Sequence, residues 1–156
     1  MPLRYQIEDW QTYWPDAEPL WKDHWLEVGL NQDTIPLDVD KERYALLDAQ
    51  GKLHIITMRD DDGELQGYYL AIVDTHLHYR TTLHAYLDVF WLHPAHRRGL
   101  AGYKLFQVVK DTLKARGVVK HIQGHKLHVH GKLGTLFERL GYHKIEHVYS
   151  TLLQEE

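Results

Sequence analysis

Two adjacent arginines followed by small residues are the first candidate for chemistry. The segment Arg97-Arg98-Gly99-Leu100-Ala101-Gly102 lies between an apolar run that ends at Leu92 and a stretch with helical spacing. A loop that enters a helix exposes backbone N–H groups, and the helix dipole adds partial positive charge there. Small residues let a ligand approach this backbone, and guanidinium groups can add charge-assisted hydrogen bonds. The segment therefore predicts a phosphate or pyrophosphate site; the alternative is a solvated turn with two surface arginines.

A carboxylate inside an apolar segment is the second candidate. Asp88 lies within "HAYLDVFWL", residues 84–92, which is apolar on both faces and predicts a central strand. Simple alternation puts Asp88 on one face with Tyr86, Phe90 and Leu92. Desolvation on such a strand would raise the pKa of the carboxyl toward values that suit a general base. The alternative is a carboxylate that pairs or caps within the core.

Histidine is abundant, with thirteen copies in the chain. They gather in two places, as His76 and His78 in a polar stretch and around a later loop as His121, His125, His128 and His130. Such spacings can bind Zn²⁺ or Ni²⁺. Because no cysteine or clear carboxylate partner completes a ligand set, we expect no metal and interpret these residues as solvated or hydrogen-bonded.

The elements that must position these residues form a mixed α/β pattern. An antiparallel start is followed by a strand–helix–strand unit, and no internal repeat or linker is visible. The spacing predicts strands at 3–8, 52–58, 65–74, 84–92, 118–122 and 142–153, and helices at about 15–28, 40–48, 100–116 and 131–140, with a polar connection at 76–83.

Composition limits the class of protein. The 156 residues are 44% hydrophobic and contain no cysteine, which predicts one globular domain without disulfides and favours a cytoplasmic location. No apolar run is long enough for a membrane span. Residues 1–50 hold four Lys/Arg against eleven Asp/Glu, whereas residues 51–156 hold fourteen against eleven. The net charge of −4 argues against a nucleic-acid-binding protein.

The segment "HPAHRRGLAGYKLF" resembles the acetyl-coenzyme A loop of the GNAT superfamily of N-acetyltransferases, whose core is Gln/Arg-x-x-Gly-x-Gly/Ala. Gly99 and Ala101 match this core, and His96 stands where the family usually has Gln or Arg. The preceding "YLDVFWLHP" resembles the fourth strand of the family, and "LGTLFERLGYHKIE" resembles its final helix and strand. The resemblance covers roughly residues 40–153, and the overall pattern is similar to that of members encoded by bacteriophages.

The resemblance implies a twisted, mostly antiparallel mixed sheet flanked by helices, whose fourth and fifth strands splay apart. The pantetheine arm of acetyl-coenzyme A would pair with the backbone near Phe90, Trp91 and Leu92. The pyrophosphate would sit on the amides of residues 97–102. His130 occupies a position where the family often has an Asn that helps to hold the cofactor.

The resemblance also raises a question about the proton donor. The family often has Tyr at the position of Phe137, where the phenol can protonate the leaving thiolate, and Phe cannot do so. Tyr149, and less so Tyr142, are the alternatives by location. For the base, Asp88 is the best candidate, with a strand N–H near Phe90 or Trp91 as oxyanion donor.

These observations predict a single GNAT-like domain over residues 1–156. Residues 1–50 would form acidic helices on the substrate side, and residues 51–153 the sheet and cofactor core. The expected activity is transfer of an acetyl group from acetyl-coenzyme A to a primary amine on a small molecule, a peptide or a protein lysine, without a metal. The alternatives are a catalytically weak module that binds acyl-coenzyme A and, further away, a His-rich metal-binding protein. We expect no nucleic-acid or membrane partner and allow for a homodimer.

Overall fold

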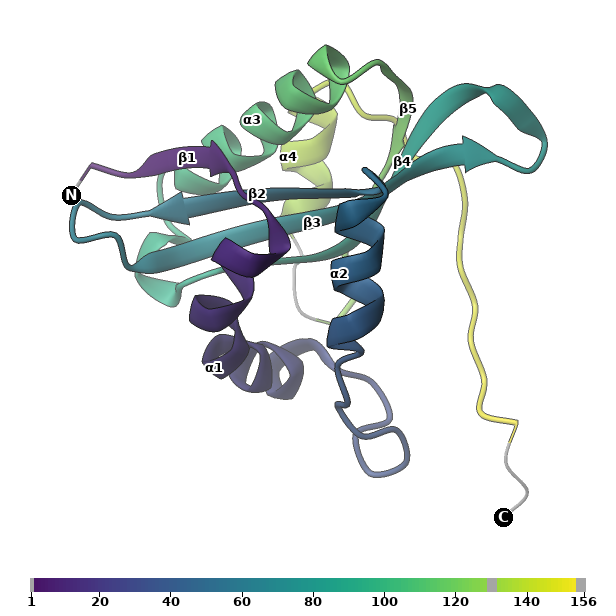
Figure 1. Ribbon diagram of the computed structural model, residues 1–156. Coiled ribbons are helices and arrows are strands. Elements are labelled where there is room, and N and C mark those ends of the chain that lie inside the picture. The colour runs from purple at the N-terminus through teal and green to yellow at the C-terminus, as the bar shows by residue number, and fades with distance from the viewer. Residues whose placement is uncertain (1, 129–131, 154–156) are drawn as a thin grey trace.

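A five-stranded sheet organises the chain in the computed structural model, which describes residues 2–128 and 132–153 (Figure 1). The strands lie in the sheet in their order along the chain, with four antiparallel strands and a fifth that pairs parallel to the fourth. This arrangement confirms the predicted mixed α/β fold with an antiparallel start. The strands are β1 (Arg4–Ile7), β2 (Leu53–Arg59), β3 (Leu65–His76), β4 (Tyr79–Leu92) and β5 (Val118–Ile122).

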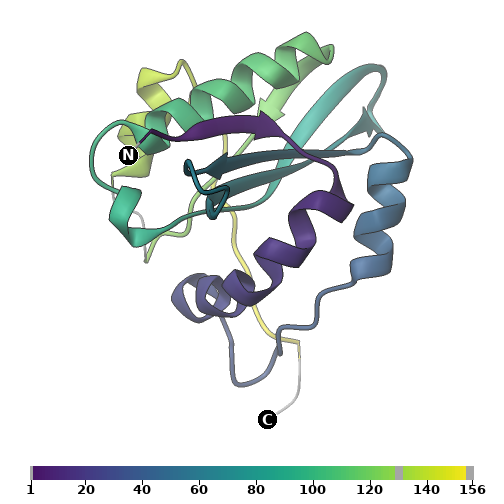
Figure 2. The ribbon, with the colours of Figure 1, turned by 60° about the vertical axis from the view of Figure 1, so that its left-hand side comes forward.

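Helices cover both faces of the sheet (Figures 1 and 2). On one face lie α1 (Trp10–Val28) and α2 (Lys41–Ala49), and on the other α3 (Ala101–Ala115) and α4 (Leu133–Arg139). The α1 face has an aromatic core that includes Trp10, Tyr13, Trp21, Tyr68 and Trp91. Among the described residues, no helix is long and apolar enough to cross a membrane.

Helix α3 has the apolar spacing of an amphipathic helix that packs on the sheet. Leu105, Phe106, Val109 and Leu113 recur at intervals of one to four residues and are all buried against the sheet. This is the single apolar stripe of an amphipathic helix. The helix ends at Ala115, and Gly117 follows with a φ of +89°. A residue in this left-handed region is a common helix stop.

The first helix begins earlier than predicted. The sequence placed its start near Pro15, whereas α1 begins at Trp10. The side chain of Asp9 accepts a hydrogen bond from the N–H of Thr12 at 2.8 Å and caps the helix. Pro15 and Pro19 lie inside the helix, so the proline mistaken for a start signal is accommodated within it.

The predicted polar connection at 76–83 is wrong. β3 extends to His76 and β4 begins at Tyr79, so only Leu77 and His78 connect them. The first three residues of β4 are exposed, because this end of the hairpin projects beyond the helices in Figure 1. A strand pair without a covered face carries polar residues and therefore resembles a loop in the sequence.

The predicted closing strand at 142–153 is also wrong. These residues form neither helix nor strand, and residues 143–153 are all exposed. A segment with strand propensity forms a strand only where it can pair with a neighbouring strand. Within the described chain this segment has no such neighbour.

Candidate functional site

The last residues of β4 are paired on one side only. Pairing with β5 runs from Leu83 opposite Val118 to Tyr86 opposite Ile122 and stops there. β4 continues to Leu92, still paired with β3. The fourth and fifth strands therefore splay apart, as the resemblance implied. This splay leaves one ladder edge of residues 87–92 without a β5 partner.

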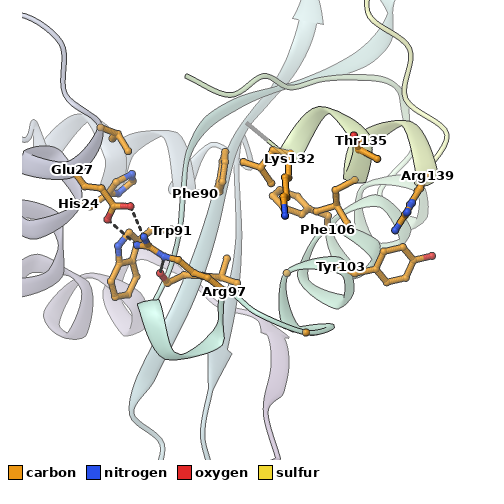
Figure 3. A pocket seen from close by; sticks show the side chains of 16 residues that line it. His24, Glu27, Phe90, Trp91, Arg97, Tyr103, Phe106, Lys132, Thr135 and Arg139 are labelled. Carbon is orange, nitrogen blue, oxygen red and sulfur yellow. Dashed lines mark hydrogen bonds and ion pairs between the residues drawn. The ribbon is translucent and has the colours of Figure 1, made fainter. Parts of the chain in front are cut away.

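A cavity of about 700 Å³ lies at this end of β4 (Figure 3). Its volume is that of a small-molecule site. Among the predicted cofactor residues, those that line it are Phe90, Trp91, Leu92, Arg97, Gly99 and Gly102. Arg98, Leu100 and Ala101 belong to the same loop and helix start but are not part of the lining. His130 lies outside the described residues.

The loop before α3 has the geometry of an anion site. Gly99 has a φ of +92°, and a Cβ there would meet no atom within 4 Å. Glycine is therefore required by the backbone turn and leaves open space at this point. Leu100 occupies the N-cap and offers no side-chain hydrogen bond. The first amides of α3 thus lack a side-chain cap, and a helix start of this kind suits a phosphate group.

The two arginines of the loop have different surroundings. Arg97 forms a bidentate ion pair with Glu27 of α1 at 2.5 and 2.8 Å, and its Nε donates to the carbonyl of Leu92 at 2.9 Å (Figure 3). Arg98 is exposed and makes no hydrogen bond or ion pair with any described residue. Arg97 consequently joins the loop to α1 and β4, whereas the charge of Arg98 faces solvent.

Two further cations line the cavity from α4 and its start. Lys132 and Arg139 share this wall with Thr135, one or two turns apart along the helix (Figure 3). Sequence reasoning missed them as ligand-binding residues. Their spacing of three, four and seven residues was the available signal, because such residues share one helix face.

Asp88 sits at a β-bulge, which corrects its predicted orientation. Val89 lies opposite Leu70 while Leu87 lies opposite Ala71, so Asp88 has no partner in β3. The extra residue breaks the alternation. Phe90 packs against the core residues on the α3 face of the sheet, which include Phe106. The carboxylate of Asp88 instead accepts a hydrogen bond from the hydroxyl of Tyr44 on α2, which covers the other face. Asp88 and Phe90 therefore do not share one face.

The surroundings of Asp88 favour its protonated form. The residue is accessible to solvent, yet partial desolvation raises the pKa of its carboxyl above the ordinary value, and the Tyr44 hydrogen bond acts in the opposite direction. The ring of Tyr44 stacks on Trp10 at 4.6 Å between centroids. Asp88 does not itself line the cavity, but lies two residues before Phe90, which does.

The α1 side of the cavity carries residues that sequence reasoning did not select as lining. His24, Glu27 and Val28 line it from one face of the helix. His24 is buried, with its Nδ1 at 2.8 Å from the hydroxyl of Tyr68. Helix α1 therefore forms one wall of the cavity, and its Glu27 places an acidic side chain next to Arg97 in the loop before α3.

The predicted acids lie elsewhere. Tyr149 is 90% exposed in the C-terminal segment and does not line the cavity. Tyr142 is held by His121, whose Nδ1 lies 2.7 Å from its hydroxyl, and desolvation raises the pKa of Tyr142 to about 12. Phe137 packs edge-on against Phe106 at 5.1 Å. None of the three places an acidic proton at the cavity.

A buried and a half-buried histidine of this chain form hydrogen bonds with hydroxyl groups. His54 contacts the hydroxyl of Thr112 at 2.9 Å, and His121 contacts that of Tyr69 at 2.7 Å. Burial lowers the pKa of each of these two histidines to about 4, so both are neutral near pH 7. Within residues 2–128 and 132–153, no group of three His, Cys, Asp or Glu side chains is placed to hold a metal ion.

The chain matches the model of the acetyltransferase (GNAT) family over residues 7–142. No curated protein matches it. Solved structures with the same fold include an aminoglycoside acetyltransferase from an uncultured soil metagenomic sample, with a TM-score of 0.76, 14% identity and coverage of 99% of this chain and 100% of that chain. Another is the ribosomal-protein-alanine N-acetyltransferase from Brucella melitensis biovar Abortus 2308, with a TM-score of 0.71, 14% identity and coverage of 98% and 100%.

A third similar structure is glucosamine-6-phosphate N-acetyltransferase from Arabidopsis thaliana, with a TM-score of 0.66, 14% identity and coverage of 99% and 100%. At these identities the likeness concerns the fold. The family match covers most of the chain, and this family and fold support acyl transfer in general. The protein belongs to the GNAT family of acetyltransferases.

Proposed function

We propose that this protein transfers an acetyl group from acetyl-coenzyme A to a primary amine. The observation that carries the proposal is the cavity at the end of β4. It brings together a strand edge that β5 leaves unpaired, a helix start without a side-chain cap, and cations from the loop and from α4. The strand edge suits an extended pantetheine arm, and the helix start and the cations suit a pyrophosphate.

The cofactor would lie across the splay. Its pantetheine amides would add to the ladder edge near Phe90, Trp91 and Leu92 as a short strand does. The pyrophosphate would meet the amides that follow Gly99, where the helix dipole favours an anion. Arg98, together with Lys132 and Arg139 from α4, would supply charge-assisted hydrogen bonds to phosphate oxygens.

The acetyl transfer itself forms a bond from the amine nitrogen to the acetyl carbon and breaks the carbon–sulfur bond. Asp88 would take the proton that the amine loses, directly or through water, and a backbone N–H near Phe90 or Trp91 would stabilise the oxyanion. The thiolate leaves and takes a proton from solvent, since Phe137 offers none. Placing the two reactants side by side supplies much of the remaining rate.

A second candidate function is a module that binds acyl-coenzyme A without turnover. The observation that favours it is the buried Phe137 at the usual Tyr position. Thiol release from acetyl-coenzyme A across a library of amines decides between the two, and the absence of cysteine removes any thiol background from the protein. Calorimetric binding without thiol release for any amine would support the module and refute the enzyme.

The two arginines should respond differently to alanine. We expect Arg98→Ala to weaken coenzyme A about tenfold and to leave a pantetheine-only analogue unchanged, because the phosphates alone interact with its charge. Arg97→Ala should weaken both ligands, since it releases the loop from Glu27 and from the carbonyl of Leu92. Calorimetric titration of both ligands measures these effects. An equal loss for both ligands in Arg98→Ala would contradict a phosphate contact.

The acidic N-terminal portion should attract a cationic acceptor only moderately. Asp16, Glu18 and Glu27 are paired with Arg59, Lys41 and Arg97. Within the described chain, the exposed carboxylates of residues 1–50 without such a pair are Asp9, Asp23, Asp33, Asp38, Asp40 and Glu42. We expect KM for a cationic amine to rise about two- to fivefold from low to high ionic strength, because salt screens exposed charges. Steady-state kinetics across a salt series test this, and an anionic amine of similar size serves as the control. A KM that is independent of salt would contradict electrostatic recruitment.

A further inference from the structure

The ion pair between Arg97 and Glu27 lies on the wall of the cavity. Arg97 lines the cavity from the loop before α3, and Glu27 lines it from α1. Their side chains are 36% and 29% exposed, whereas those of the buried pair Arg59 and Glu8 are 9% and 3% exposed. A partly exposed ion pair contributes little to stability, because water competes for both charges. The pair on the cavity wall can therefore open at little cost to the fold.

A carboxylate in this place opposes the binding of a polyanion. The start of α3 and the side chains of Lys132 and Arg139 favour negative charge on a ligand, whereas Glu27 repels it. Figure 3 shows Arg97 turned toward Glu27 on α1, with Lys132 and Arg139 on the opposite wall. Glu27 thus holds one cation of the loop away from the other cations of the cavity.

The contacts of Arg97 with Glu27 are of the kind that a phosphate group makes. Nη1 and Nη2 donate to the two carboxylate oxygens at 2.5 and 2.8 Å. A guanidinium uses the same N–H groups to hold two oxygens of a phosphate. Arg97 precedes Gly99 by two residues, so rotation about its side-chain bonds can bring these groups to a phosphate at the start of α3. Because both anions need the same N–H groups, Arg97 binds one of them at a time.

We propose that Glu27 competes with the phosphates of coenzyme A for the guanidinium of Arg97. This competition rests on the coenzyme A site of the proposed function. When coenzyme A binds, Arg97 leaves Glu27 for the pyrophosphate. After acetyl transfer Glu27 takes Arg97 back, which weakens the hold on the phosphates and speeds the release of free coenzyme A. Product release limits the turnover of many enzymes, so Glu27 would act on the rate through Arg97 as a positioning residue.

Glu27→Gln should tighten the binding of coenzyme A about tenfold and change that of pantetheine by less than about twofold. Gln keeps the length of the side chain and an acceptor oxygen, but without the charge it no longer competes with phosphate. Pantetheine has no phosphate and therefore leaves Arg97 with residue 27 in both proteins. Calorimetry measures the two affinities, and stopped-flow displacement should show that the gain for coenzyme A lies mainly in a slower dissociation rate. Unchanged or weaker binding of coenzyme A would overturn the proposal, since Glu27 would then only hold the loop in place.

Two controls separate competition from a general effect of charge. In an Arg97→Ala background, Glu27→Gln should give no gain in affinity, because the contested guanidinium is absent. Asp23→Asn removes another carboxylate from α1 that is exposed and, among the described residues, has no ion pair, and it should change the affinity by less than about twofold. An equal gain in the Arg97→Ala background or in Asp23→Asn would overturn the competition.

The same measurements distinguish this proposal from the proposed function. A wild-type protein that binds no coenzyme A would refute the cofactor site and the competition together. Coenzyme A binding that tightens as expected in Glu27→Gln, without thiol release for any amine, would support the competition and refute acetyl transfer.

Discussion

Gly99→Glu should weaken the binding of acetyl-coenzyme A by about a hundredfold or more while the fold survives. A Cβ at this position meets no protein atom within 4 Å, so the new side chain has open space to enter where the proposed site would hold the pyrophosphate. Its carboxylate would repel the phosphates at the start of α3. The φ of +92° also opposes any side chain, and the distorted turn would misplace the amides. Isothermal calorimetry measures the affinity, and circular dichroism monitors the fold.

Gly117→Glu provides the matched control. Gly117 has nearly the same backbone conformation, with a φ of +89° and no atom within 4 Å of a Cβ, but it lies at the other end of α3. The control carries the same strain and the same charge away from the cavity. Affinity like that of the wild type in Gly99→Glu, or an equal loss in both variants, would refute the proposed phosphate site.

Asp88→Asn should lower kcat by about a hundredfold and leave the affinity for acetyl-coenzyme A nearly unchanged. The amide cannot take the proton that the amine must lose. Since desolvation raises the pKa of Asp88, its basic form accumulates only above that raised pKa. The rate of the wild type should therefore rise with pH through this group, and the Asn variant should lose that limb. A pH–rate profile of both proteins tests this.

Thermal stability distinguishes catalysis from a bracing role for Asp88. A carboxyl whose pKa is raised by folding is destabilising when ionised, so folding is disfavoured as pH rises through that pKa. Asp88→Asn should then melt at the same temperature as the wild type or above it near pH 7. A lower melting temperature with an unaltered pH–rate profile would indicate that Asp88 only braces the sheet through Tyr44.

Tyr44→Phe tests whether the pH dependence of the rate follows the pKa of Asp88. The variant keeps the ring that stacks on Trp10 and removes the hydrogen bond that lowers the pKa of Asp88. The ascending limb of the pH–rate profile should move to higher pH while most of kcat remains. A limb that does not move would assign the titration to the amine or to another group.

Local patterns in the sequence determined much of this protein. The helical spacing of Leu105, Val109 and Leu113 predicted α3, and the apolar run of residues 84–92 predicted most of the central strand. The small residues of the loop predicted an anion site. The same loop resembles that of the GNAT superfamily, and the chain matches the model of this family and shares the fold of its solved structures. These features depend on residues within a few positions of one another, so they are visible without the fold.

Contacts between distant segments decided the rest. Nothing adjacent to Arg97 and Arg98 distinguishes them, but Glu27, seventy residues away, engages Arg97 alone. The bulge that turns Asp88 toward Tyr44 depends on the register between β3 and β4, and a shift of one residue changes the face of a side chain. Residues 142–153 have the composition of a strand, yet no strand of the described chain lies beside them. An ion pair, a register and a strand partner each require two segments to meet, and the tertiary structure alone decides which segments do.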